Sequence, residues 1–303
     1  MKLKKFNWNF SNLRLKDNTC KWFSEIIEDK NIDFSILGIP MDLGVNFRPG
    51  ARFAPNTIRE ELAKNSCFLM DKRKDFATLK LKDYGDISLG NSFCKAHIEI
   101  KKTIEELELN ETKTIFLGGD HSITYSTIRS LKDVEALILF DAHLDCRKPI
   151  ENFEHSGNWL YKILEKNIIE PNNIFILGVS GNNYSPHYLE KLENKGITIF
   201  TVSEFRKRNI IEEIVRILKN KITYVSFDID CIDQSQAPGT SVPSSNGFFS
   251  YEIYDSIYIL SKEEKIKYLD IVEVNPILDK DNITSKVASQ VIIHFLAGFS
   301  RKE

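Results

Sequence analysis

The sequence lacks the long hydrophobic runs that membrane proteins and secreted precursors carry. Its longest apolar runs, such as residues 136–140 and 291–293, are far shorter than the roughly 20 residues that span a bilayer. The first ten residues hold three lysines and several aromatic side chains but no continuous apolar segment of the secretory kind. We therefore expect a soluble protein that does not insert into a membrane.

The sequence also lacks a large excess of one charge and closely paired cysteines. The 303 residues include 41 Lys and Arg against 43 Asp and Glu, a formal net charge of −2, so no basic field favours nucleic acid as a partner. The five cysteines never form a close pair, which argues against a zinc knuckle or a redox dithiol. They are typical of reduced thiols, and we expect a cytoplasmic protein.

Short apolar segments alternate with segments of helical periodicity along the chain. This alternation predicts a mostly parallel sheet covered by helices on both faces, a three-layer α/β/α fold. We find no repeat, low-complexity tract or long linker, so one domain is expected over residues 1–303. The expected strands are 34–37, 114–117, 136–140, 174–177, 197–200, 222–227 and 266–272. The expected helices are 55–64, 92–109, 122–131, 158–166, 186–194, 210–219, 250–260 and 283–297.

Histidine and aspartate gather directly after three of the expected strands. The motif GGDHS follows strand 114–117, DAHLD follows strand 136–140, and DIDCID follows strand 222–227. The carboxyl ends of parallel strands meet at one edge of a sheet, where an open sheet leaves a crevice for a ligand. We therefore expect these polar residues to surround one site.

Their spacing favours a metal centre. If the strand stays extended, the alternate residues of DAHLD point to one face, and the first two aspartates of DIDCID do the same. Four crowded carboxylates resist ionisation unless cations lie between them. Each motif alone also fits a turn or a helix cap, but together with two imidazoles they suit two divalent ions, with Mn²⁺ the natural choice. The candidate ligands are His121, Asp141, His143, Asp145, Asp228 and Asp230.

These motifs resemble the signatures of the ureohydrolase family, the arginase, agmatinase and formimidoylglutamase group. The resemblance extends to RPGARFAPNTIRE at 48–60, APGTSVPSSNGF at 237–248 and EVNP at 273–276, and so covers most of the chain. It implies an arginase-like fold, two Mn²⁺ ions per subunit, a small-molecule substrate and assembly into a homo-oligomer.

The resemblance also implies roles for individual residues. A water activated between the ions would attack a guanidino or formimidoyl carbon, oriented by Asp145 or Asp230. Glu273 would pair with the cationic C–N group of the substrate, although a carboxylate at a strand end can also be a plain surface residue. One ion would be held by His121 and Asp145 and the other by His143 and Asp230, with Asp141 and Asp228 bridging.

The segment after the second signature bears on the substrate. Arginases and agmatinases carry a histidine directly before a glycine there, where it serves proton transfer. Here Ser156 precedes Gly157 and His155 comes one place earlier, which is more similar to formimidoylglutamases. A one-residue bulge could still bring His155 into the site, and otherwise it is a loop histidine.

Two further residues are candidates for substrate binding. Formimidoylglutamases are similar in placing an arginine where Arg147 stands, and its planar guanidinium suits a carboxylate. Arg147 could instead pair with Glu151 or Asp120 at the rim. Asn183 lies in a loop whose counterpart contacts the amino-acid end of the substrate in family members, but it could equally be a turn residue.

The sequence therefore predicts manganese-dependent hydrolysis of N-formimidoyl-L-glutamate to L-glutamate and formamide. The alternative is a ureohydrolase that acts on arginine, agmatine or another guanidino compound and releases urea. A non-catalytic metal-binding protein is disfavoured by the complete ligand set with Glu273. A two-metal phosphoesterase is disfavoured because no phosphate cradle accompanies the site. Cys146 and Cys231, beside the ligands, are expected to be packed thiols.

Overall fold

One large sheet runs through the chain. The computed structural model describes residues 2–8, 20–27, 32–45, 47–149, 155–181 and 184–299. In these residues nine strands form a sheet in the order β1-β5-β2-β6-β11-β10-β7-β8-β9, with every neighbouring pair parallel except β1 and β5. The strands are β1 (Leu3–Lys4), β2 (Phe34–Gly38), β5 (Leu81–Ile87), β6 (Lys113–Leu117), β7 (Ala136–Phe140), β8 (Ile174–Val179), β9 (Thr198–Thr201), β10 (Thr223–Asp228) and β11 (Ile266–Val272). Two short strands, β3 (Phe68–Leu69) and β4 (Lys74–Asp75), pair separately.

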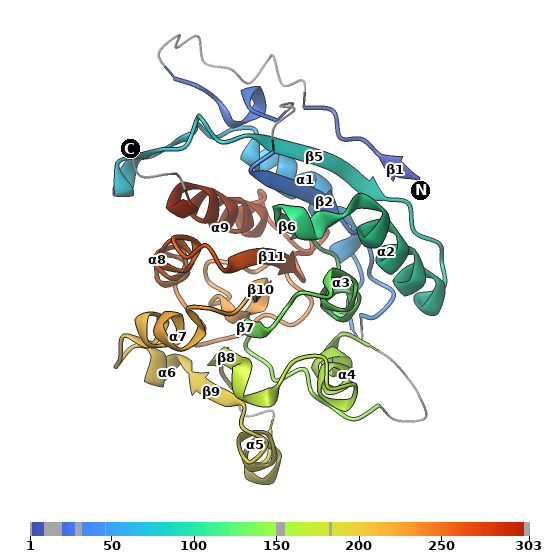
Figure 1. Cartoon of the computed structure of the whole chain (residues 1–303), viewed down its shortest axis with the longest axis vertical. Helices are drawn as coiled ribbons and strands as arrows, with labels where there is room; N and C mark the ends of the chain where they lie inside the picture. Colours follow the sequence, from blue (N-terminus) through green and yellow to red (C-terminus); the bar gives the residue numbers. More distant parts are fainter. Residues whose placement is uncertain are drawn as a thin grey trace.

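Helices cover both faces of this sheet (Figure 1). One hydrophobic core holds residues of α1 (Ala54–Leu62), α6 (Val202–Phe205), α7 (Ile210–Leu218), α8 (Ser250–Ser261) and α9 (Ile283–Phe299). The other holds residues of α2 (Phe93–Leu107), α3 (Ile123–Leu131), α4 (Trp159–Glu165) and α5 (Pro186–Glu193). Successive residues of β2 and β6 enter opposite cores, so the central strands are apolar on both faces. The predicted three-layer α/β/α fold is confirmed.

All seven expected strands are present, but β5 was not expected from the sequence. Its residues include Asp83 and Asp86, which are unusual so near a core. Both carboxylates pair with Arg59 of α1, whose guanidinium is fully buried, at 2.8 Å for Asp83 and 2.5 Å for Asp86. Arg59, which stabilises the strand, precedes Asp83 by 24 residues in the sequence, so a local hydrophobic pattern does not reveal it.

The topology places β6, β11, β10 and β7 side by side in the sheet. Each of these strands is followed by polar residues at its carboxyl end, so four loops converge at one edge. In the described part of the chain, no helix combines the length and the apolar character needed to cross a bilayer.

Candidate metal centre

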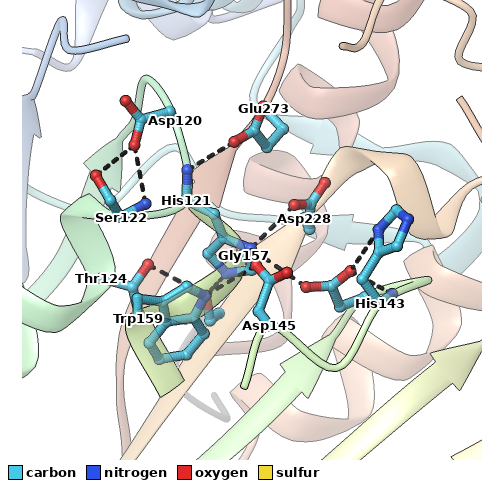
Figure 2. A network of polar contacts seen from close by, with 12 residues as sticks. Asp120, His121, Ser122, Thr124, His143, Asp145, Gly157, Trp159, Asp228 and Glu273 are labelled. Carbon is cyan, nitrogen blue, oxygen red and sulfur yellow. Dashed lines mark hydrogen bonds and ion pairs between the residues drawn. The ribbon is translucent and has the colours of Figure 1, made fainter. Parts of the chain in front are cut away.

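Six side chains from three of these loops meet at the carboxyl edge. Figure 2 labels four of them, His121, His143, Asp145 and Asp228. Nδ1 of His121 lies 2.9 Å from Oδ2 of Asp228, 3.1 Å from Oδ2 of Asp145 and 3.2 Å from Oδ2 of Asp141. A second group, which shares Asp141, is formed with His143 and Asp230. The six predicted side chains are therefore together, in two groups whose possible ligand atoms lie within 4.8 Å of one another.

The expected reason for this convergence is wrong, because neither strand stays extended through its motif. β7 ends at Phe140, and the chain bends where Oδ1 of Asp141 accepts the His143 N–H at 2.6 Å. After β10 the chain makes a 3₁₀ turn in which Oδ1 of Asp228 accepts the Asp230 N–H at 2.8 Å. Aspartates thus fold the backbone back on itself as in Asx turns, and the turns, not alternation along a strand, bring the side chains together.

Among the residues that the structure describes, two buried polar atoms in the cluster have no hydrogen-bond partner, namely Nδ1 of His121 and Oδ2 of Asp141. An unpaired buried polar atom costs free energy, so its presence calls for an explanation. A cation between these atoms would satisfy both. The donors are imidazole nitrogens and carboxylate oxygens only, which suits a hard to borderline divalent ion such as Mn²⁺.

The other nitrogen of His121 is held by residues that the sequence analysis did not single out. The Ser226 hydroxyl donates to Oδ1 of Asp270 at 2.8 Å, so at 2.9 Å from Nε2 of His121 it acts as acceptor for the ring N–H. This tautomer leaves the lone pair on Nδ1, toward the carboxylates, as a metal ligand requires. The signal in the sequence was a serine and an aspartate within otherwise apolar strands.

In the metal-free chain, the charges and the burial of the cluster favour the protonated forms of several of its side chains. Burial disfavours a charged His121, but the carboxylates around it outweigh burial and raise its pKa well above the usual value. Asp230 likewise raises the pKa of His143 against the effect of burial. Burial and the neighbouring carboxylates raise the pKa of Asp141 to about 6. A metal ion must therefore displace protons when it binds.

Glu273 follows β11 and reaches the same site. Its N–H donates to the Gly119 carbonyl at 2.8 Å, and its Oε1 accepts the backbone N–H of His121 at 2.8 Å. The residue has a positive φ of 62°, a left-handed conformation that residues other than glycine seldom adopt. Burial and the nearby Asp120 raise the pKa of the Glu273 carboxyl to about 8.

A cavity of about 290 Å³ opens beside the cluster. His143, Asp145, Asp228, Asp230 and Glu273 line it together with Arg147, Ser156, Tyr184 and apolar side chains. The guanidinium carbon of Arg147 lies 5.8 Å from the ring centroid of Tyr184. The Tyr184 hydroxyl is fixed by the N–H of Leu144 at 2.9 Å. Phe47, Val242 and Tyr184 in this wall had no signal in the sequence beyond their place in loops.

Arg147 forms no ion pair with another residue that the structure describes. Asp120, one of its expected partners, is buried elsewhere, where Oδ2 accepts the Gly44 N–H at 2.8 Å and Oδ1 accepts the Ser122 N–H at 2.9 Å. Glu151, the other, lies outside the described residues, and so does Asn183. A role for Asn183 in substrate binding stays a prediction.

His155 and Ser156 lie at the start of a 3₁₀ turn before α4. Ser156 lines the cavity, and its N–H donates to the Gly44 carbonyl at 2.8 Å. His155 is not among the lining residues. Its Nδ1 accepts the Gly157 N–H at 3.0 Å, an ordinary hydrogen-bond distance. Its part in proton transfer stays a prediction.

Cys146 and Cys231 are buried on opposite sides of the sheet, one in each hydrophobic core. Burial raises the pKa of the Cys146 thiol to about 12 and that of Cys231 well above its usual value. Both are therefore protonated, packed thiols, as expected, and neither belongs to the groups that could hold a metal.

The chain belongs to the arginase family, which it matches over residues 32–298. It is 32% identical over 283 residues to a formimidoylglutamase of Halalkalibacterium halodurans, a match that covers 89% of both chains. It is also 31% identical over 283 residues to an agmatinase of Bacillus subtilis, with 90% of this chain and 93% of the agmatinase covered. Family membership and the ligand cluster define a metallohydrolase with a candidate two-metal site.

Solved structures of relatives share the arginase-like fold. A crystal structure of the Bacillus subtilis formimidoylglutamase superposes with a TM-score of 0.87 at 28% identity, covering 95% of this chain and 94% of that one. A Trypanosoma cruzi formiminoglutamase, described as solved with Mn²⁺, gives a TM-score of 0.85 at 24% identity, with 94% and 100% covered.

Proposed function

We propose that this protein is a manganese-dependent formimidoylglutamase of histidine degradation. It would hydrolyse the C–N bond of N-formimidoyl-L-glutamate with one water and release L-glutamate and formamide. The observation that carries the proposal is Arg147, a cation in the same cavity as the ligand cluster with no ion pair to any described residue. A guanidinium so placed suits a substrate that carries carboxylates.

The six clustered side chains would hold two Mn²⁺ ions. The geometric groups agree with one ion near His121 and Asp145 and another near His143 and Asp230, with Asp141 common to both groups. Asp228 falls in the first group only, and the bridging role that the family resemblance implies for it stays a prediction. Two such ions would lower the pKa of a water enough to supply a nucleophile at neutral pH.

Other residues around the cavity would position the attacking water and bind the substrate. Asp145 and Asp230 line the cavity and would accept a hydrogen bond from the attacking water, which fixes its direction. Glu273, whose backbone N–H and Oε1 are both anchored to the loop after β6, would face the cationic formimidoyl nitrogen. Arg147, resting near Tyr184, would bind a carboxylate at the glutamate end.

The second candidate is hydrolysis of a guanidino compound with release of urea. Its support is the 31% identity to an agmatinase, nearly the same as that to the formimidoylglutamase. Agmatine carries no carboxylate and is cationic at both ends, so Arg147 would repel it. This repulsion ranks the formimidoyl substrate above agmatine. Arginine and guanidinobutyrate also carry a carboxylate, and against them the ranking rests on Ser156, which stands directly before Gly157 where arginases and agmatinases carry a histidine.

The experiment is a substrate panel on the Mn²⁺-loaded protein. N-formimidoyl-L-glutamate, arginine, agmatine and guanidinobutyrate would be assayed side by side, with formamide and urea measured separately. We expect formamide from the first substrate and no urea from the others. Urea from any guanidino substrate, without formamide from the first, would favour the second candidate.

Two properties complete the proposal. All five cysteines are free thiols, which supports action in a reducing, cytoplasmic compartment. We further propose that the chain assembles into a homo-oligomer and binds neither nucleic acid nor membrane. Sedimentation of the purified protein would test the assembly.

A further inference from the structure

Trp159, the first residue of α4, packs against the candidate metal centre from outside the cavity (Figure 2). Its side chain is 1% exposed. The indole N–H donates to Oδ2 of Asp145 at 3.1 Å, and the indole ring lies 4.8 Å from the ring of His121, with 36° between the planes. Trp159 therefore contacts two of the proposed ligands of one ion, and it is not itself among the described residues that line the substrate cavity.

The oxygen that Trp159 contacts is the one that faces the metal position. Oδ2 of Asp145 lies 3.1 Å from Nδ1 of His121, the nitrogen whose lone pair points into the cluster. A carboxylate oxygen has two lone pairs, so it can accept the indole N–H and still offer the other lone pair to a cation. A buried indole N–H needs an acceptor, and this need fixes the rotation of the carboxylate.

The backbone of Asp145 is held from the same place. Its carbonyl accepts the N–H of Leu160 at 3.1 Å, so the first two residues of α4 bind both the main chain and the side chain of Asp145. Asp145 has a φ of 41°, a left-handed conformation that residues other than glycine seldom adopt. Such a conformation persists only where surrounding contacts enforce it, and α4 supplies those contacts.

We propose that Trp159 is a positioning residue for the ion that His121 and Asp145 would hold, and that its fluorescence reports the occupancy of that position. The inference rests on the ligand roles proposed above. Side chains that hydrogen-bond to a metal ligand orient it, and their loss typically lowers metal affinity by about 10- to 100-fold. The described contacts of the indole are with Asp145 and His121 and not with His143 or Asp230, so binding of the ion that these last two would hold should be affected less.

The first test uses the unsubstituted tryptophan. The chain has three tryptophans, so Trp8→Phe combined with Trp22→Phe leaves Trp159 as the only indole. Titration with Mn²⁺, which quenches a nearby indole, should lower its emission in parallel with the binding measured by equilibrium dialysis. Adding His121→Asn to the same protein should abolish this change. Emission that stays constant while two Mn²⁺ ions bind would overturn the proposal.

The second test removes the donor and keeps an aromatic ring. Trp159→Phe should weaken the binding of one Mn²⁺ by about tenfold, and at limiting metal its electron paramagnetic resonance spectrum should show isolated Mn²⁺ in place of a spin-coupled pair. Trp8→Phe is the matched control, because it also deletes an indole N–H bonded to an aspartate, Asp83 at 2.9 Å, outside the cluster. Its Mn²⁺ binding should match that of the unsubstituted chain.

Two outcomes separate this inference from the proposed function. If the unsubstituted chain binds two Mn²⁺ ions and Trp159→Phe binds them with equal affinity, the positioning role is wrong and the ligand set stands. If the unsubstituted chain binds no Mn²⁺ at all, the ligand set is wrong, and the role of Trp159 falls with it.

Discussion

At the residue scale, Asp141 holds the most central place in the site. It is fully buried, it belongs to both groups that could hold a metal, and its Oδ2 has no hydrogen-bond partner in the part of the chain that the structure describes. Its other oxygen accepts the His143 N–H and shapes the loop. One side chain thus serves the local turn and both proposed ions, whereas Asp230 belongs to one group only.

Asp141→Asn should therefore impair both ions, and Asp230→Asn mainly one. We expect Asp141→Asn to reduce the rate of formamide release by more than about 100-fold, because even indirect partners of a ligand change activity by about 10- to 100-fold. Elemental analysis should find little Mn²⁺ in Asp141→Asn and an intermediate content in Asp230→Asn. Two tightly bound ions in Asp141→Asn would exclude its bridging role.

Arg147→Met should raise KM for N-formimidoyl-L-glutamate and change kcat much less. A hydrogen bond to a charged group contributes about 1.5–3 kcal/mol, which corresponds to a rise of about 10- to 100-fold in KM. Lys148→Met, at the neighbouring exposed residue outside the cavity lining, is the control and should leave KM unchanged. An unchanged KM in Arg147→Met would mean that the carboxylates bind elsewhere.

His97 should make the folded protein sensitive to acid. Its Nδ1 lies 2.6 Å from the Ser126 hydroxyl, and burial, with a smaller effect of Lys162, lowers its pKa to about 4. Between pH 6.5 and 4 the unfolded chain binds a proton at this residue that the folded chain does not bind. The free energy of unfolding should therefore decrease as the pH is lowered through this window, by up to about 1.4 kcal/mol per pH unit from this group. The free energy of unfolding, measured with urea at several pH values on metal-free protein, should depend less steeply on pH in His97→Gln than in the unsubstituted protein. An equal dependence on pH in the two proteins would contradict the lowered pKa.

At the element scale, the strands that carry the site were predictable and their surroundings were not. β6, β7, β10 and β11 are apolar on both faces, so composition alone marks them. β5 was missed because a buried Arg59 neutralises its charges across the fold. The indole bond of Trp159 to Asp145 was missed for the same reason, since partners 14 residues apart leave no periodic signal.

The turn between β6 and α3 depends on a glycine where two backbones meet. A Cβ at Gly119 would lie 1.7 Å from the carbonyl oxygen of Met41, so Gly119→Ala must displace the turn that carries His121. We expect the free energy of unfolding to fall by about 1–3 kcal/mol or more. At Gly90 a Cβ would meet only the Glu99 carboxylate at 3.8 Å, and Gly90→Ala should change stability by less than about 0.5 kcal/mol. Equal stabilities of the two variants in urea would contradict this close approach.

At the scale of the whole molecule, the order of the strands assembles the site. The three motifs and Glu273 are spread over more than 150 residues, from His121 to Glu273, yet their strands are neighbours in one sheet. The sequence alone indicated which edge of the sheet would carry the site. It did not indicate the strand order or the shape of the loops, because pairing between distant strands leaves no local pattern.

The central claim is that one two-metal site, opened to a carboxylate-bearing substrate by Arg147, performs the hydrolysis. The most direct measurement is formamide release from N-formimidoyl-L-glutamate by metal-free protein titrated with Mn²⁺, with bound metal counted in the same samples. We predict activity that depends on added Mn²⁺ and levels off at about two ions per chain. Full activity without metal, or saturated Mn²⁺ sites that release urea from a guanidino compound and no formamide, would contradict the claim.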